Sequence, residues 1–268
     1  MVSHLSALIR LTLFLTWTLL CLGPYLAVFS LGKLRAALVC IYWRVVCRIT
    51  GINLAVFGKM TQERPVLFVA NHVSYLDILV LGSLIEAIFV AKSEVAGWPG
   101  INILAWLGRT VFVERRPRLA ISQTTKMTKH LEGGESLIVF SEGTSTDGQR
   151  VLPFKSALFV AAETLIDGQP VLVQPVSVTY TRLNGMPMGR AWRPLYAWYG
   201  DMTLVPHLWK VLGLGQALVE IEFHPPVRLS DYASRKALAQ HCHRVVKHGV
   251  SLALSGRRPE TVSTPPPS

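Results

Sequence analysis

The N-terminal part of the chain contains no acidic residue. Neither aspartate nor glutamate occurs from Met1 to Gln62, although six lysines and arginines lie there. Of the 268 residues, only 16% are charged and half are hydrophobic, and the formal net charge is +11. The mean hydropathy of +0.37 is too high for an ordinary soluble protein and too low for a polytopic channel. The composition therefore predicts a membrane-associated globular protein whose basic, apolar N-terminal part contacts an anionic membrane surface.

Nucleic acid is the competing partner for such a basic chain. The sequence contains no nucleic-acid recognition motif, and its basic residues are dispersed among Leu, Val and Trp. Many of these lysines and arginines can simply solubilise the surface. We therefore expect no nucleic-acid partner.

Cysteine is scarce as well. The four cysteines form no Cys-x-x-Cys pair, and no His/Cys cluster accompanies them. This argues against a disulfide framework and against a metal site, and it predicts buried thiols in a reducing compartment. A Gly-x-Ser-x-Gly motif is also absent, so an acyl-serine intermediate is not expected.

An almost wholly apolar run covers residues 11–32, about the length that crosses a bilayer. Gly23-Pro24 lies within it, and because proline removes a backbone donor and favours a kink, the run can either span the membrane or enter and return. A secretory signal is the competing interpretation. It is disfavoured because the run is long and no small-x-small cleavage site follows it.

A second apolar segment covers residues 34–49. It carries Arg44 and Arg48 on one side and Trp43 at a spacing typical of interfaces, which predicts an amphipathic helix in the headgroup layer. We expect residues 1–50 to anchor the protein to the inner membrane of the cell. The basic residues after the first apolar run predict that the rest of the chain lies on the cytoplasmic side.

From residue 51 onwards, short β-like runs alternate with helical ones. Strands are predicted at residues 53–57, 65–70, 88–91, 110–114, 137–140, 171–180 and 217–224. Helices are predicted at residues 77–85, 100–107, 118–131, 154–166, 202–212 and 231–254. This alternation predicts an α/β domain over residues 51–254, with a mainly parallel central sheet flanked by helices. Residues 255–268, which include three consecutive prolines, are predicted to be a disordered tail.

The stretch Asn71-His72-Val73-Ser74-Tyr75-Leu76-Asp77 is the first candidate site. An apolar run ends abruptly before His72, and Asp77 opens the next apolar run five residues later. This pattern predicts a strand, a sharp polar loop and then a helix. A neutral imidazole at a strand end, with a carboxylate in the first turn of the next helix, is a plausible general base with its orienting partner.

A histidine and an acid at this spacing need not be catalytic. His130 and Glu135 repeat the spacing at a polar helix end, where no function is needed. Ser74 and Asp77 fit a capping box at a helix start. Capping remains compatible with orienting an imidazole, because both roles place the carboxylate in the first helical turn.

Three further stretches place polar residues at predicted strand ends. Arg109 precedes one strand, and two more arginines follow that strand. Glu142 and Gly143 follow another, at the edge where α/β sheets usually hold ligands. Pro175 interrupts the apolar run Val173-Gln174-Pro175-Val176, which predicts an edge strand or a bulge beside a site.

Together these stretches resemble the glycerolipid acyltransferase family, whose best-known members are the 1-acyl-sn-glycerol-3-phosphate acyltransferases. Residues 71–77 resemble the first block of that family, and residues 108–116, 140–144 and 173–176 are similar to the second, third and fourth. Lys92 matches a family lysine between the first two blocks. The similarity covers residues 51–180, and four blocks in order are far more specific than any single one.

The resemblance implies transfer of a fatty acyl group from a thioester of acyl carrier protein or coenzyme A to a lipid hydroxyl, with no cofactor and no metal. His72 would take the proton of the hydroxyl, and Asp77 would fix the tautomer of His72. Backbone amides near Asn71 or at the start of the next helix are candidate oxyanion donors. Substrate binding would involve Lys92, Arg109, Glu142, Gly143, Thr144 and Ser145.

One departure from the family pattern concerns the acceptor. In lysophosphatidate enzymes the third block usually continues Glu-Gly-Thr-Arg, and that arginine is expected to hold a phosphate. Here Ser145 replaces it and Asp147 adds an acid, which would suit an acceptor with an ammonium group. The region is similar to the branch that acylates lyso-ornithine lipid, in which a 3-hydroxyacyl group is amide-linked to ornithine. We favour this acceptor; lysophosphatidate is the alternative, because Lys92, Arg109 and Lys155 still offer positive charge.

Two other functions stay open. A catalytically silent member of the fold that binds lipid would have the same basic surface and amphipathic segment, but it would not need His72 and Asp77. A thioester or lipid hydrolase would need water in the site, which a tunnel apposed to the membrane disfavours.

Overall fold

The computed structural model describes residues 2–92, 110–113 and 120–257. The predicted helix at residues 100–107 and the candidate binding residue Arg109 lie outside these ranges. So does most of the predicted tail. These features remain predictions.

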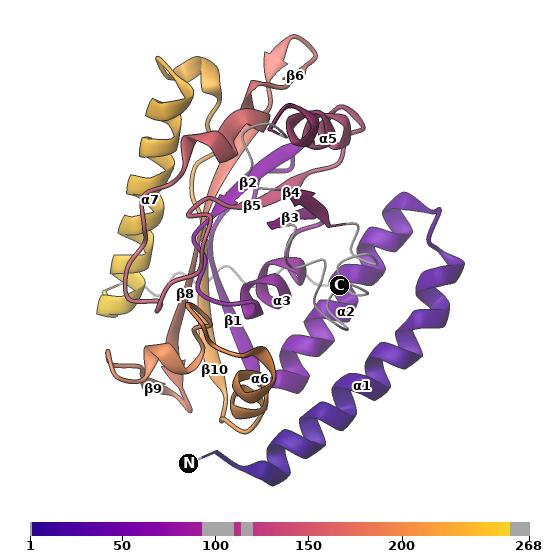
Figure 1. The fold of residues 1–268 in the computed structure, drawn as a ribbon, viewed down its shortest axis with the longest axis vertical. Coiled ribbons are helices and arrows are strands. Elements are labelled where there is room, and N and C mark those ends of the chain that lie inside the picture. Colours follow the sequence, from indigo (N-terminus) through magenta and orange to yellow (C-terminus); the bar gives the residue numbers. More distant parts are fainter. Residues whose placement is uncertain (1, 93–109, 114–119, 258–268) are drawn as a thin grey trace.

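A sheet forms the centre of the molecule (Figure 1). Its strands follow the order β1-β10-β8-β2-β5-β3-β4, and the short β9 (Met186–Pro187) pairs with β8. The pair β10/β8 is antiparallel, and the other neighbours along this path are parallel. The prediction of a mainly parallel α/β sheet is confirmed. The strands are β1 (Ile52–Gly58), β2 (Val66–Ala70), β3 (Ile88–Lys92), β4 (Val111–Val113), β5 (Leu137–Phe140), β8 (Leu172–Leu183) and β10 (Ala217–Phe223).

Both faces of the sheet are covered, and strand β2 shows why. All five of its residues are buried, as expected for a parallel strand packed on two sides. Successive side chains point to opposite faces, so Phe68 and Ala70 belong to one core layer while Leu67 and Val69 belong to the other.

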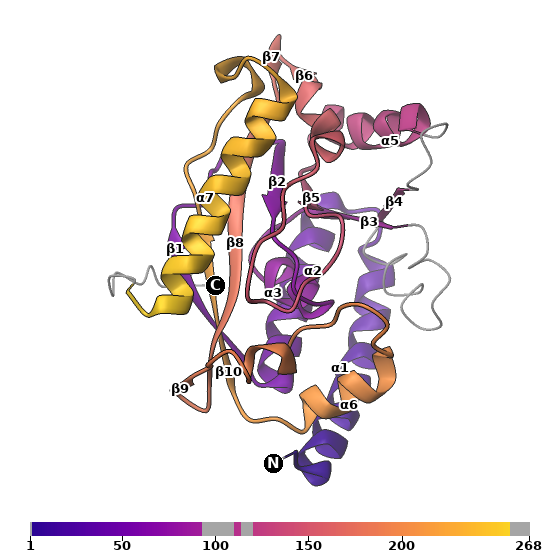
Figure 2. The ribbon, with the colours of Figure 1, turned by 60° about the vertical axis from the view of Figure 1, so that its left-hand side comes forward.

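Helices cover the two faces separately, as Figures 1 and 2 show. One layer contains α5, α7 and the 3-10 helix η3, and the opposite layer contains α3, α6 and one side of α2. The bounds are α2 (Gly32–Thr50), α3 (Leu76–Gly82), α5 (Ala120–Glu132), η3 (Ser156–Glu163), α6 (Leu204–Leu212) and α7 (Arg235–Ser255). The smaller elements are β6 (Leu165–Ile166), β7 (Gln169–Pro170), η4 (Arg193–Leu195) and η5 (Leu229–Asp231).

The N-terminal part is a helical hairpin of α1 (His4–Ala27) and α2, on the side of the sheet opposite α7 (Figure 1). The guanidinium of Arg10 fastens α1 to the domain, because it donates to the carbonyls of Leu212 at 3.2 Å and Leu214 at 2.7 Å. Most large apolar side chains of α1 are exposed, and among the described residues α1 is the one helix long and apolar enough to cross a membrane. This apolar surface supports membrane association, while spanning or re-entry remains a prediction.

The interfacial prediction for α2 is wrong for two side chains. Trp43 packs against Gly82 in α3, where an added Cβ would lie 2.6 Å from the indole. Arg44 donates to the carbonyl of Ser83 at 2.9 Å, so it satisfies a backbone acceptor at the end of α3. Arg48 is exposed. Helix α2 therefore faces the domain with Trp43 and Arg44, two of the three residues that the sequence placed in the headgroup layer.

Two further predictions need correction. Strand β8 is paired on both sides, so Pro175 does not mark an edge. The pairing of β8 with β10 ends at Val176, next to Pro175. Proline has no backbone N–H, and it is tolerated at this position because no residue of β10 lies opposite to accept a hydrogen bond from it. The helix predicted for residues 154–166 is the shorter η3, after which the chain turns into β6.

Candidate active site

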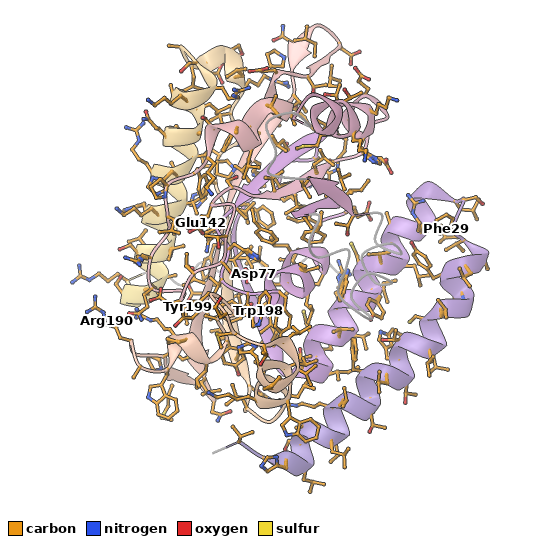
Figure 3. All side chains as sticks on the ribbon, viewed as in Figure 1. Phe29, Asp77, Glu142, Arg190, Trp198 and Tyr199 are labelled. Atoms are coloured by element: carbon orange, nitrogen blue, oxygen red, sulfur yellow. The ribbon has the colours of Figure 1, made fainter. Side chains whose placement is uncertain are left out.

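Two parallel strands end side by side at the site. Strands β2 and β5 pair in register as far as Ala70 and Phe140. His72 and Glu142 each lie two residues beyond that pair, at the carboxyl edge of the sheet where α/β proteins bind their ligands. Figure 3 shows Asp77 and Glu142 near the centre of the molecule, far from the turn of the α1–α2 hairpin.

The imidazole of His72 is held in one tautomer. Its Nδ1 lies 2.9 Å from Oδ2 of Asp77. Because a carboxylate only accepts, Nδ1 carries the proton and Nε2 is left with a lone pair. No hydrogen bond engages Nε2 among the described residues. The ring stacks on Phe140 with the centroids 4.0 Å apart and is 20% exposed, so His72 has the orientation of a general base that a substrate can reach.

Asp77 is fully buried and is surrounded by donors. Besides the imidazole, its Oδ2 accepts the backbone N–H groups of Val73 at 2.7 Å and Ser74 at 3.0 Å. The hydroxyl of Tyr180 donates to its Oδ1 at 3.0 Å. These bonds offset the cost of burying a carboxylate. The predicted capping box is only half formed, because the hydroxyl of Ser74 has no partner among the described residues.

The same network corrects the prediction that amides near Asn71 bind the oxyanion, whereas the prediction for amides at the start of α3 stays a prediction. The amides of Val73 and Ser74 bind Asp77, and the amide of His72 donates to Oε1 of Glu142 at 2.8 Å. These three amides are therefore not available to a reacting oxygen. Asn71 has a structural role instead, since its side chain pairs with the backbone of Val178 in β8 at 2.8 and 2.9 Å.

Glu142 joins the His72 segment to the loop after β5. One carboxylate oxygen accepts the amide of His72, and the other accepts the amide of Leu152 at 2.6 Å. Burial is the main cause that raises the pKa of Glu142 to about 7; the charge of Asp77 acts in the same direction, and the two amides act in the opposite direction. Glu142 therefore positions the backbone of His72, and its predicted role in substrate binding stays a prediction.

Gly143 opens the loop that follows Glu142, with φ of +67° in the left-handed region. A Cβ at this position would lie 3.2 Å from the side chain of Lys155, so glycine allows that lysine to lie across the turn. Further along, Thr146 donates its backbone N–H to the carbonyl of His72 at 3.0 Å. The loop after the third block is thus hydrogen-bonded to the first block. Thr144 and Ser145 lie in this loop and are half-buried.

The structure describes only part of the two predicted cationic binding residues, Lys92 and Arg109. Lys92 ends β3, where its backbone pairs with Val113 of β4. The position of the Lys92 side chain and the whole of Arg109 lie outside the described part of the chain. Their roles in substrate binding therefore stay predictions.

Sequence reasoning missed Tyr180. The sequence alone could have shown that Tyr180 points into the core, although not what it contacts there. Val176 and Val178 precede it at alternate positions of β8, and all three face the core layer that contains α3. The polar tip of a residue in that row meets the first turn of α3, where Asp77 lies. Within the described residues there is no group of three or more His, Cys, Asp or Glu side chains that could hold a metal ion.

Comparison with known proteins agrees with this geometry. Residues 53–179 match the model of a family described as Acyltransferase. The chain is 44% identical over 220 residues to a lyso-ornithine lipid O-acyltransferase of Brucella abortus, covering 81% of this chain and 82% of the relative. The chain belongs to the acyltransferase family. This acyltransferase is also 42% identical, over 221 residues, to a lyso-ornithine lipid O-acyltransferase of Rhizobium meliloti, covering 81% of the chain and 76% of the relative.

More distant relatives carry another name. A 1-acyl-sn-glycerol-3-phosphate acyltransferase of Neisseria gonorrhoeae is 33% identical over 170 residues, or 62% of each chain. The crystal structure of a 1-acyl-sn-glycerophosphate acyltransferase from Thermotoga maritima matches with a TM-score of 0.68 at 23% identity and covers 96% of both chains. At that identity the match supports the α/β fold of the acyltransferase.

Proposed function

We propose that this acyltransferase moves a fatty acyl chain from a thioester to the free hydroxyl of lyso-ornithine lipid. The observation that carries the proposal is the similarity to two relatives of that name, at 42% and 44% identity over about four-fifths of the chain. Ser145 and Asp147 support it independently, because the third block lacks the arginine that a phosphate acceptor would need.

The site supports direct transfer between the two substrates. Nε2 of His72 accepts the proton of the acceptor hydroxyl while the hydroxyl oxygen attacks the thioester carbonyl. Asp77 stabilises the imidazolium that forms and keeps Nδ1 protonated. When the tetrahedral intermediate collapses, the C–S bond breaks, and the leaving thiolate takes the proton back from Nε2. The ester and the free thiol are the products.

The net charge and helix α1 support the proposals for the acyl donor and for the location. A net charge of +11 favours acidic partners, so acyl carrier protein and coenzyme A are both suitable thioester carriers. The exposed apolar face of α1 favours the inner membrane, with the catalytic domain on the cytoplasmic side. In this position the site would meet both the lipid acceptor and a soluble thioester.

A competition assay tests the acceptor. The purified full chain in detergent receives radiolabelled acyl-acyl carrier protein and equal amounts of lyso-ornithine lipid and lysophosphatidate. We expect the label in ornithine lipid. Labelling of phosphatidate alone would overturn the proposal, and repeating the assay with acyl-coenzyme A identifies the carrier.

Lysophosphatidate is the second candidate acceptor. It is favoured by the relatives named 1-acyl-sn-glycerol-3-phosphate acyltransferase. It is also favoured by the side chain of Lys155, which lies across Gly143 and offers a positive charge to a phosphate. The same competition assay decides between the two acceptors.

A further inference from the structure

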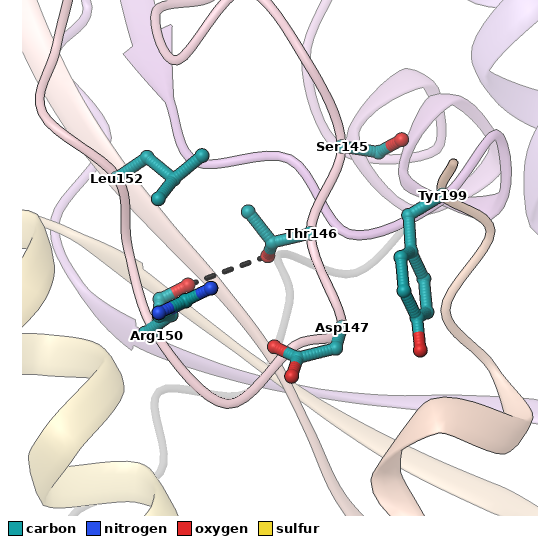
Figure 4. A pocket seen from close by; sticks show the side chains of 6 residues that line it. All are labelled: Ser145, Thr146, Asp147, Arg150, Leu152 and Tyr199. Atoms are coloured by element: carbon teal, nitrogen blue, oxygen red, sulfur yellow. Dashed lines mark hydrogen bonds between the residues drawn. The ribbon is translucent and has the colours of Figure 1, made fainter.

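A hollow lined by charged, polar and apolar side chains lies beside the catalytic loop (Figure 4). Its volume is about 160 Å³, and its lining comes from two segments that are distant in the sequence. The loop after Gly143 contributes five residues, and Tyr199 stands across from Ser145 and Asp147. The lining residues are Ser145, Thr146, Asp147, Arg150, Leu152 and Tyr199.

Both walls of the hollow are hydrogen-bonded to the segment that carries the base. The amide of Thr146 donates to the carbonyl of His72 at 3.0 Å. The amide of Trp198, next to Tyr199, donates to the carbonyl of Val73, also at 3.0 Å. Two consecutive carbonyls thus fix the two walls, and a group bound in the hollow is held close to His72.

The two charged side chains of the hollow form no ion pair within the described part of the chain. One carboxylate oxygen of Asp147 accepts the amide of Gln149 at 3.0 Å, and the other has no partner among the described residues. The guanidinium of Arg150 likewise forms no ion pair within the described part of the chain, not even with Asp147. A carboxylate and a guanidinium that share a hollow without pairing leave room for a ligand with both complementary charges.

We propose that this hollow binds the head group of the acceptor, with Asp147 binding an ammonium and Arg150 binding a carboxylate. This inference rests on the proposed function, since the ornithine head group carries both of these groups. Its reactive hydroxyl lies only a few bonds from the carboxylate, which suits a hollow whose walls are bonded to His72 and Val73. Tyr199 adds an aromatic face, which favours a neighbouring cation.

The charge balance of the hollow favours a zwitterion over a phosphate. One acid and one base line it, so its formal charge is zero. A phosphate monoester brings nearly two negative charges and three acceptor oxygens, and it would meet the carboxylate of Asp147 at close range. An amino acid head group meets an opposite charge at each end.

The test pairs two variants with two altered acceptors. Asp147→Asn keeps the acceptor oxygen for the amide of Gln149 and removes only the charge. Arg150→Gln removes the guanidinium. The acceptors are the 3-hydroxyacyl amides of ornithine, of norvaline, which lacks the ammonium, and of ornithine methyl ester, which lacks the carboxylate. KM and kcat are measured with the full chain in detergent.

Each variant should be sensitive to one acceptor group only. With the ornithine acceptor, each substitution is expected to raise KM about tenfold with kcat little changed, as for loss of a partly exposed charge-assisted hydrogen bond. Asp147→Asn should have no effect on KM for the norvaline acceptor, and Arg150→Gln none for the methyl ester. The exposed residues Asp201 and Arg190 provide matched controls, because Asp201→Asn and Arg190→Gln change the same charges outside the hollow.

The possible failures are distinguishable. If the wild-type protein does not acylate the ornithine acceptor, the proposed function fails and the head-group assignment fails with it. If the wild type acylates that acceptor but the variants keep its KM, or raise KM equally for all three acceptors, the assignment of the hollow alone is overturned.

Discussion

Two histidines of this chain form the same pair with a carboxylate five residues later. Nδ1 of His72 lies 2.9 Å from Asp77, and Nδ1 of His130 lies 2.7 Å from Glu135. The two imidazole side chains are almost equally accessible, at 20% and 23% exposed. Spacing, hydrogen bond and exposure therefore do not distinguish a candidate base from an ordinary surface histidine.

The surroundings of the carboxylates do distinguish the two pairs. Asp77 is fully buried and accepts from two backbone amides and from Tyr180. Glu135 is 31% exposed, and Arg35 lies 3.5 Å from it in a solvent-accessible ion pair. A buried carboxylate that cannot move holds its imidazole in one orientation, whereas an exposed pair is worth little and can exchange partners with water.

The location of each pair differs as well. His72 follows the carboxyl end of β2 and stacks on Phe140 from the next parallel strand. His130 lies in the last turn of α5, and Glu135 lies just before the amino end of β5, at the opposite end of the strand from His72. The proposed catalytic geometry thus requires the convergence of two strand ends around the imidazole. Four experiments test whether this contrast between the pairs holds.

Replacing the two histidines gives the largest expected difference. His72→Ala should lower the rate of acyl transfer by about 10²–10⁴-fold, since it removes the proton acceptor. His130→Ala should stay within about twofold, because it removes only an exposed ion pair. Both rates are measured as labelled product from acyl-acyl carrier protein, and circular dichroism checks folding. Wild-type activity in folded His72→Ala would end the proposed mechanism.

Replacing the two carboxylates gives the second-largest expected difference in activity. Asp77→Asn keeps the shape but puts an amide beside Nδ1, which favours the wrong tautomer and no longer stabilises the imidazolium. We expect kcat to fall about 10²–10³-fold, within the range for general base catalysis. Glu135→Gln should leave kcat unchanged. If both amides reduced kcat equally, burial of the carboxylate would not be what sets the pairs apart.

Tyr180 tests whether the network around Asp77 matters beyond the pair itself. Tyr180→Phe removes one donor to a buried carboxylate and is expected to lower kcat about tenfold with KM unchanged, the lower end for a hydrogen bond to a charged group. Tyr196 is the matched control: it stacks on Tyr180 at 5.6 Å, and its hydroxyl has no partner among the described residues. Tyr196→Phe should keep kcat. Equal losses in the two variants would assign Tyr180 a packing role only.

These contrasts also explain what the sequence allowed us to predict. The alternation of strands and helices predicted the α/β sheet, because parallel strands covered on both sides must read as short apolar runs. The motif at His72 was recognisable because strand ends carry polar residues. The role of Tyr180 and the half-formed capping box at Ser74 were not predictable, since both depend on the register in which distant segments meet. The prediction for Trp43 and Arg44 was wrong for a similar reason. An amphipathic pattern shows that a helix has a polar and an apolar face, but it does not show what each face contacts.

Glu142 gives the smallest expected effect and extends the comparison to pH. Burial raises its pKa from the ordinary value of 4.5 to about 7, so the folded state binds this proton more tightly than the unfolded state does. Its contribution to stability is therefore present at low pH and is lost as the pH rises through 7, by at most about 3 kcal/mol. The melting temperature of wild type minus that of Glu142→Gln should fall by several degrees between about pH 5 and pH 8.

The control is Glu132→Gln, which removes an exposed carboxylate. Its difference in melting temperature from wild type should not change over the same pH range. Parallel curves for wild type and Glu142→Gln would show that Glu142 is ionised throughout, and that its two amide bonds outweigh its burial.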